Sequence, residues 1–212
     1  MATSKELSGV RADRKYSYRA LEKFADHVRE VLKYGPSDAI DALRLFEDLH
    51  QIKIQLSDGK VIPFGSGVTS LEDSEGYTRY DQSAQIIEIL ASELTYRRLE
   101  QGHPRSAYFV GHELGHCVLH TDQLVRLAQM PTNQQAAFHR GRAGHKPYED
   151  TEWQANAFSS ALLMPARGLA SLEASCGGNL TPEDVAGRFH VSTEAAGYRL
   201  TIYQGRKHEL IS

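Results

Sequence analysis

The order of apolar and polar residues predicts helices at the start of the chain. A first amphipathic helix is predicted between Ser17, as its N-cap, and a stop at Gly35 and Pro36. Its apolar positions recur every three or four residues and are Leu21, Phe24, Ala25, Val28, Val31 and Leu32. A second helix is predicted after Ser37, with an apolar face of Ile40, Leu43, Phe46 and Leu49. Residues 1–15 are polar and are expected to be frayed.

The period then changes to two, which is typical of strands. Ile52, Ile54 and Leu56 alternate with polar residues, and the turn signal Asp58-Gly59 predicts a hairpin with the strand that follows. Two further short strands are predicted at 77–80 and 85–90. Later segments are predicted to be helical, at 92–101, 104–120, 149–163, 166–175, 182–190 and 193–203. The polar stretch 121–148 is predicted to be a long loop with room for one short helix.

Composition and charge restrict the class of protein. The 212 residues suit one domain with an appendage, or two small domains. The net charge is −3, so the chain lacks the basic footprint of a nucleic-acid binder. No apolar run approaches the ~18 residues of a membrane span, and no secretory signal is visible. The two cysteines, Cys117 and Cys176, exclude a disulfide scaffold and a cysteine-rich zinc module, and they predict a cytoplasmic location.

The strongest chemical signal is an H-E-x-x-H motif formed by His112, Glu113 and His116. Histidines four residues apart share one helix face, so two imidazole nitrogens can reach one Zn²⁺ at about 2.0–2.1 Å. Glu113 is rotated about 100° from His112, which places its carboxylate beside the metal as a base for water. Three fixed positions also occur by chance in helices, but the apolar surroundings favour a catalytic zinc site.

A catalytic zinc site needs a third protein ligand and one open position. The candidates are His120, Glu149, Asp150 and Glu152. His120 lies about 12 Å along a straight helix from His112, so the three imidazoles do not converge on one ion. His120 is therefore predicted to contact the ligands from outside or to end the helix.

The three acidic candidates lie at the start of the next predicted helix, 149–163. Glu152 shares the buried face of that helix, where a carboxylate needs a cation. Glu149 and Asp150 instead suit the helix N-terminus, where the helix dipole favours negative charge. The pattern therefore favours Glu152 as the third ligand.

Two segments together resemble the ImmA/IrrE family of metallopeptidases. Its members carry an H-E-L-G-H-x-x-x-H helix and a second helix of the form E-x-x-A-N-x-F-A-x-x-L-L-M-P. Here these are residues 112–120 and 152–165, with Ser159 in place of the usual alanine. The resemblance is specific over 104–165, weaker over 76–91, and does not extend clearly to 1–70.

The resemblance implies a zincin-like peptidase with zinc ligands His112, His116 and Glu152 and with Glu113 as the general base. His120 and Asn156 are candidates for holding the ligands from outside. We therefore expect an α+β fold that is mostly helical, with a small antiparallel N-terminal sheet. Since the gap between the two motifs looks long for the family, the 121–148 loop is expected to be an elaboration of this chain.

The last part of the chain, 166–212, is expected to be a helix-turn-helix-like segment packed on a peptidase domain of residues 1–165. Thr181 and Ser192 are predicted N-caps, with Pro182 as a first helical residue. The charge of residues 181–212 sums to zero, and the second helix opens with Ser-Thr-Glu, which offers no Arg, Asn or Gln to read bases. Direct DNA binding is therefore not expected.

The expected function is a zinc-dependent endopeptidase. By resemblance, its partner is a specific regulatory protein such as a helix-turn-helix repressor, whose cleavage would switch on stress-response or mobile-element genes. The alternative is a non-catalytic zinc-containing module that binds protein or is associated with DNA. The intact Glu113 favours the enzyme, because a structural metal site tolerates Gln or Ala there. No membrane partner is expected.

Two further sets of residues are candidates for a role in the site. Cys117 follows a ligand in the sequence but is expected to be a buried core thiol, because its side chain points about 100° away from that of His116. An oxyanion could be stabilised by one of five side chains, and the sequence leaves the choice open. These are His103, His139, His145, Tyr148 and Tyr198.

Overall fold

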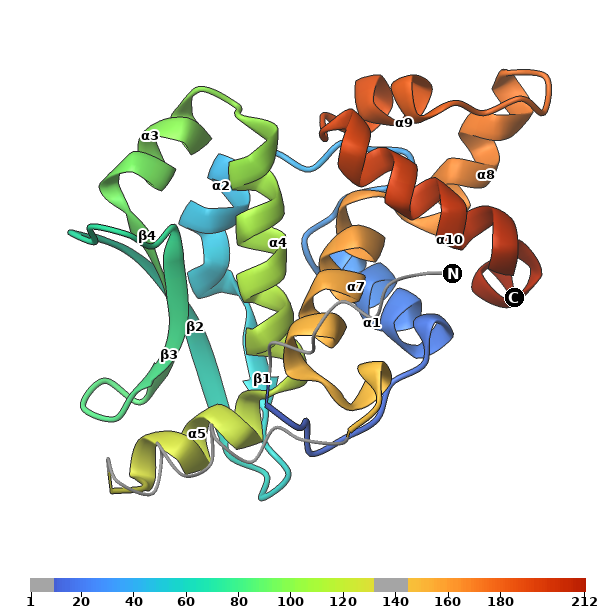
Figure 1. Ribbon diagram of the computed structural model, residues 1–212. Coiled ribbons are helices and arrows are strands. Elements are labelled where there is room, and N and C mark those ends of the chain that lie inside the picture. The colour runs from blue at the N-terminus through green and yellow to red at the C-terminus, as the bar shows by residue number, and fades with distance from the viewer. Residues whose placement is uncertain (1–9, 132–144) are drawn as a thin grey trace.

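The computed structural model describes residues 10–131 and 145–212. Figure 1 shows a small sheet with helices on one of its sides, next to a second, wholly helical half of the molecule. The helices α4 and α7 lie side by side where these halves meet, and they make the most extensive helix–helix contact of the fold. The predicted α+β fold class is confirmed. Within the described residues, no helix has the length and apolar character needed to cross a membrane.

The first helix forms where the pattern placed it. Helix α1 is Tyr18–Val31, and the Ser17 side chain accepts a hydrogen bond from the Ala20 amide at its start. The second helix was predicted to follow Ser37, but α2 is Ala42–Glu47 and continues as a 3₁₀ turn, η1, Asp48–Gln51.

The later start of α2 has a local cause. The Asp38 carboxylate accepts a hydrogen bond from the Gly35 amide, and the Asp38 carbonyl accepts one from the Arg29 side chain. These two hydrogen bonds hold residues 35–38 in a turn. The Asp41 carboxylate then accepts from the Arg44 amide and caps the helix.

The sheet is mixed, not antiparallel as predicted. Its strands are β1 Lys53–Gln55, β2 Val61–Thr69, β3 Gly76–Asp81 and β4 Ile86–Ser92, in the order β1-β2-β4-β3. The β1–β2 hairpin and the β3–β4 pair are antiparallel, but β2 and β4 are parallel. Strand β3 lies at the edge of the sheet, and β4 then runs between β3 and β2, parallel to β2. Strand β3 contacts both α4 and α5.

The remaining helices follow the predicted segments closely. They are α3 Glu93–Glu100, α4 Pro104–Leu119, α5 Thr121–Gln129, the 3₁₀ turn η2 Pro147–Glu149, α7 Thr151–Leu163, α8 Ala166–Ser175, α9 Pro182–Phe189 and α10 Thr193–Ile211. Helix α5 occupies the first part of the predicted 121–148 loop, while residues 132–144 and His139 lie outside the described residues. Helix α10 runs eight residues past its predicted end at 203.

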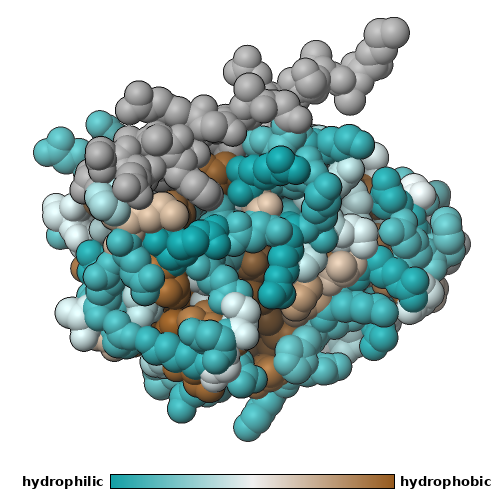
Figure 2. All heavy atoms as spheres, turned by 90° about the horizontal axis from the view of Figure 1, so that it is seen from below, coloured by the Kyte–Doolittle hydropathy of each residue, from teal (hydrophilic) through white to brown (hydrophobic). Residues whose placement is uncertain are grey.

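The C-terminal helices share one apolar core with the rest of the chain. Val185, Phe189 and Leu200 belong to the same cluster of buried side chains as Leu21 and Leu163. Figure 2 shows the polar exterior of the face seen from below, with apolar residues visible in recesses between hydrophilic ones. The division of the chain at residue 165 stays a prediction, although this core crosses it.

A buried ion pair also joins α10 to α1. Arg199 Nη2 lies 2.7 and 2.8 Å from the two carboxylate oxygens of Glu22, and its Nε donates to the Met164 carbonyl. Glu22 Oε1 also accepts from the Ala166 amide. Both charged side chains are almost fully buried, so each depends on the other for compensation.

Replacing Arg199 with Leu is therefore expected to lower the free energy of unfolding by about 3–5 kcal/mol, because Glu22 keeps a buried charge without its cation. Urea denaturation measures the loss. The double variant Glu22→Leu/Arg199→Leu should lose less, since neither charge remains. Arg206→Leu, which removes an exposed pair with Glu209, should cost less than about 1 kcal/mol. Equal losses in the single and double variants would contradict this account.

Candidate metal centre

Two glycines bring the helices that carry the site into close contact. Gly111 and Gly115 lie one turn apart on α4 and face α7. A Cβ atom at Gly115 would lie 3.0 Å from the Cα of Ala155, and one at Gly111 would lie 2.6 Å from the Oγ of Ser159. The absence of these Cβ atoms lets the start of α7 reach the H-E-x-x-H turn of α4.

Gly115→Ala is expected to lower the free energy of unfolding by about 1–3 kcal/mol, because its Cβ meets backbone that cannot rotate away. This loss outweighs the gain of up to about 1 kcal/mol in helix propensity. The matched control is Gly205→Ala in α10, where a Cβ has open space, and this variant should be neutral or stabilised. Thermal unfolding compares the two variants. A Gly115→Ala protein as stable as the control would show that the helices do not need this contact.

Three side chains from these two helices converge on one point. His112 Nε2 lies 3.1 Å from His116 Nε2 and 3.2 Å from Glu152 Oε2, and His116 Nε2 lies 3.3 Å from Glu152 Oε1. Two ligands of a tetrahedral Zn²⁺ at about 2.0–2.1 Å are separated by about 3.3–3.4 Å, so the Nε2–Nε2 distance is close to one edge of such a site, and each nitrogen has a different Glu152 oxygen at a similar distance. The donor set, two imidazole nitrogens and one carboxylate, also suits Zn²⁺.

The two remaining ring nitrogens are held from outside. His112 Nδ1 lies 3.0 Å from Asn156 Oδ1, and His116 Nδ1 lies 3.1 Å from His120 Nδ1. His120 follows the last residue of α4, where the chain turns into α5, and its ring does not reach the converging atoms. The structure thus places His120 and Asn156 behind the cluster, with both Nε2 atoms directed inward.

The electrostatics of the cluster favour positive charge. Hydrogen bonds from His112 and His116 hold the pKa of Glu152 well below its usual range. Burial acts to lower the pKa of His112, but the bond to Glu152 and the charge of Glu113 raise it above its ordinary value. Behind the cluster, burial and the neighbouring His116 lower the pKa of His120 to about 3, so this ring stays neutral. A divalent cation bound between these side chains would likewise compensate the negative charge of Glu152.

Glu113 lies beside the three converging residues and faces the same cavity. Its side chain is nearly buried, and its Oε2 accepts a hydrogen bond of 2.7 Å from the Thr78 hydroxyl on β3. The cavity has a volume of about 280 Å³ and is lined by both polar and apolar side chains. It is lined by Val10, Tyr77, Thr78, His112, Glu113, His116, His120, Gln123, Leu124, Leu127, Thr151 and Glu152. Sequence reasoning missed Thr78, because one threonine in an alternating strand carries no signal of its own.

The other acidic candidates are engaged elsewhere. Glu149 accepts from the Lys146 amide and pairs with Lys15, while Asp150 caps α7 and pairs with His145. Both side chains are more buried than that of Glu152, which is 35% exposed. The sequence predicted Glu152 to be the buried carboxylate of the three, and this was wrong, because Glu152 is the most exposed of them. The geometry nevertheless brings Glu152, and not Glu149, to the histidines.

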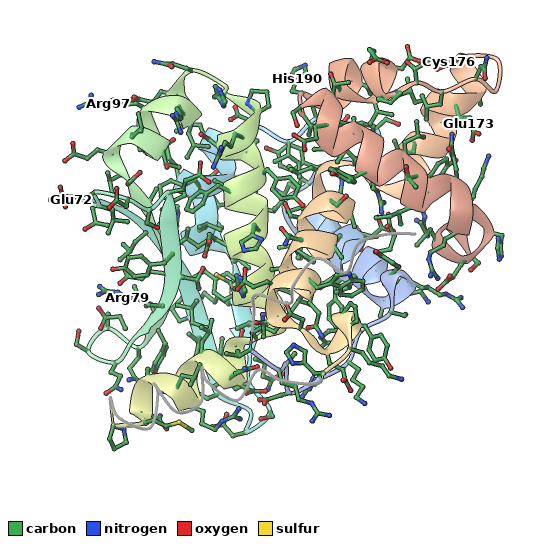
Figure 3. The ribbon with its side chains drawn as sticks, in the orientation of Figure 1. Glu72, Arg79, Arg97, Glu173, Cys176 and His190 are labelled. Atoms are coloured by element: carbon green, nitrogen blue, oxygen red, sulfur yellow. The ribbon has the colours of Figure 1, made fainter. Side chains whose placement is uncertain are left out.

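The remaining candidates do not join the site. Cys117 is fully buried, and burial raises the pKa of its thiol, as expected for a core residue. Figure 3 shows Cys176 at the outer end of α8, away from α4 and α7. Of the oxyanion candidates in the described residues, His103 caps the opposite end of α4, and neither His145, Tyr148 nor Tyr198 lines the cavity. His139 lies outside the described residues.

Comparison with known proteins gives the class of this domain. Residues 99–201 match the Peptidase M78 family model, described as the IrrE N-terminal-like domain, which is a metallopeptidase family. Residues 99–201 are therefore similar to an IrrE N-terminal-like domain, and the resemblance to the ImmA/IrrE family is confirmed. The matched residues include both helices of the cluster and continue into α10.

The other comparisons add little to this match. No curated protein matches the sequence. Among solved structures, a Mycobacterium tuberculosis transcriptional regulator is similar over 85% of this chain, with 16% identity and a TM-score of 0.48. This chain covers 46% of that structure's length.

Proposed function

We propose that the chain is a zinc-dependent endopeptidase. The observation that carries the proposal is the Glu113 carboxylate, which faces the same cavity as a His-His-Glu cluster with the spacing of zinc ligands. A structural zinc site is usually closed by four protein ligands, whereas a catalytic site has three and keeps one position open. Three converging ligands with a carboxylate beside them match the catalytic arrangement.

In this proposal His112, His116 and Glu152 hold the ion. When bound, zinc supplies Lewis acidity that polarises a peptide carbonyl and lowers the pKa of water to about 7. Glu113 accepts a proton from the attacking water and delivers it to the leaving amine nitrogen. The Thr78 hydroxyl holds Oε2 of Glu113, which leaves Oε1 for the proton transfer.

The family resemblance supports a protein substrate. We propose a regulatory protein such as a helix-turn-helix repressor, whose cleavage in the cytoplasm would switch on stress-response or mobile-element genes. Residues 181–212 carry no net positive charge, so the C-terminal helix pair is not expected to bind DNA directly. We therefore propose that the chain acts on gene expression through a protein.

The test incubates the zinc-loaded chain with any helix-turn-helix repressor that a neighbouring gene encodes. The proposal predicts cleavage of the repressor that stops when a chelator removes the metal and returns when Zn²⁺ is added back. A zinc-loaded chain that binds the repressor stably without cleaving it would contradict the enzyme and support the non-catalytic binding module.

A further inference from the structure

Behind the candidate ligand His116, a line of hydrogen bonds runs through His120 to Gln154 and ends at two backbone carbonyls. We propose that Gln154 and His120 are positioning residues that fix the tautomer of His116, so that its Nε2 carries a free lone pair for the metal. The inference rests on the proposed metal site. It concerns a residue, Gln154, that occupies an unspecified position of the E-x-x-A-N motif.

The orientation of the Gln154 amide starts the argument. Gln154 is fully buried, and its Nε2 lies 2.8 Å from the carbonyl oxygens of both Arg14 and Tyr148. An NH₂ group donates two hydrogen bonds and so satisfies both carbonyls. A flipped amide would place its oxygen against two other acceptors, so Gln154 Oε1 must point the opposite way, where it lies 2.9 Å from His120 Nε2.

The hydrogen positions of the two histidines then follow in turn. Gln154 Oε1 only accepts, so His120 Nε2 carries a hydrogen and donates it. In a neutral imidazole the other nitrogen is a bare acceptor, so His120 Nδ1 accepts from His116 Nδ1 across their 3.1 Å contact. With a hydrogen held on Nδ1, neutral His116 has its lone pair on Nε2, available to an ion placed between His112, His116 and Glu152.

A single hydrogen bond fixes the tautomer of the other candidate histidine ligand, His112. Asn156 Oδ1 accepts from His112 Nδ1 and leaves His112 Nε2 free. The His116 route is longer and also ties the start of the described chain to the site, because one of the two carbonyls belongs to Arg14. Without an acceptor at its Nδ1, His116 can carry hydrogen on Nε2, where it blocks the metal.

The test compares His120→Leu with His120→Asn in the full chain, with Zn²⁺ affinity measured by competition with a chelating dye. His120→Leu removes the acceptor and should weaken Zn²⁺ binding about 10–100-fold. The Asn side-chain oxygen can accept from His116 Nδ1, so His120→Asn should retain most of the affinity. Both variants remove the ring and its contact with Gln154, so a role in packing alone predicts equal losses. His208→Leu, at an exposed position of α10, is the matched control and should bind Zn²⁺ as the unmodified chain does.

A second measurement uses the unmodified chain and stands even if a variant does not fold. Long-range ¹H–¹⁵N NMR spectra distinguish the two imidazole tautomers, and we expect hydrogen on Nε2 of His120 and on Nδ1 of His116 in the zinc-loaded protein. Hydrogen on Nδ1 of His120, or equal losses in the two His120 variants, would overturn the relay. An unmodified chain that binds no Zn²⁺ would overturn the proposed metal site instead, and the tautomer of His120 in that protein would still decide the relay.

Discussion

Replacing Glu113 with Gln is expected to lower the rate of substrate cleavage by at least two orders of magnitude and to leave zinc binding unchanged. Glutamine keeps the size of the side chain and still accepts the hydrogen bond from Thr78, but it cannot take a proton from water. General-base catalysis typically contributes ~10²–10⁴-fold, which sets the expected loss. Initial cleavage rates and zinc content are measured on the same samples.

Glu93→Gln in α3 is the matched control, because it makes the same chemical change on an exposed side chain away from the cavity. It should cleave at the rate of the unmodified chain. The Glu113→Gln protein should also hold its substrate longer, since the complex no longer turns over. Equal cleavage by the Glu113→Gln and unmodified proteins would show that another group is the base.

Glu152→Ala is expected to weaken zinc binding by more than the ~10–100-fold that is typical of losing a partner outside the ligands. The substitution removes the carboxylate that lies 3.2–3.3 Å from both histidine nitrogens and leaves the two imidazoles without the third residue of the cluster. Metal analysis after dialysis against a weak chelator measures the effect.

Glu149→Ala is the control for that substitution, because it removes a carboxylate of the same segment that contacts Lys15 and the Lys146 amide instead of the histidines. This variant should keep its zinc. Full zinc occupancy in Glu152→Ala, with loss of zinc in Glu149→Ala, would show that Glu149 is the third ligand instead.

The parts of the fold that could be predicted from the sequence are those with a local cause. Ser17 caps α1, and the alternation before Asp58-Gly59 forms the β1–β2 hairpin, because caps and tight turns depend on residues a few positions apart. The facing histidines of α4 follow from helix geometry for the same reason. The third residue of the cluster needed the second motif as well, since its partner helix begins 35 residues after His116.

The parts that could not be predicted depend on contacts between distant segments. The parallel pairing of β2 with β4 could not be predicted, because it joins residues more than 20 positions apart and depends on how the chain crosses the sheet through β3. The burial of Glu149 and Asp150 comes from residues 10–12, which run beside them through the Arg11–Asp150 bridge. Gln154 was likewise invisible, because its partners lie 140, 34 and 6 residues away along the chain.

The central claim is that His112, His116 and Glu152 hold one zinc ion and leave a coordination position open beside Glu113. Anomalous diffraction at the zinc edge, on crystals of the zinc-loaded chain, tests this claim most directly. The account predicts one strong peak at about 2.0–2.1 Å from Nε2 of each histidine and from a carboxylate oxygen of Glu152, with no fourth protein ligand. A peak elsewhere, or a fourth protein side chain closing the site, would contradict it.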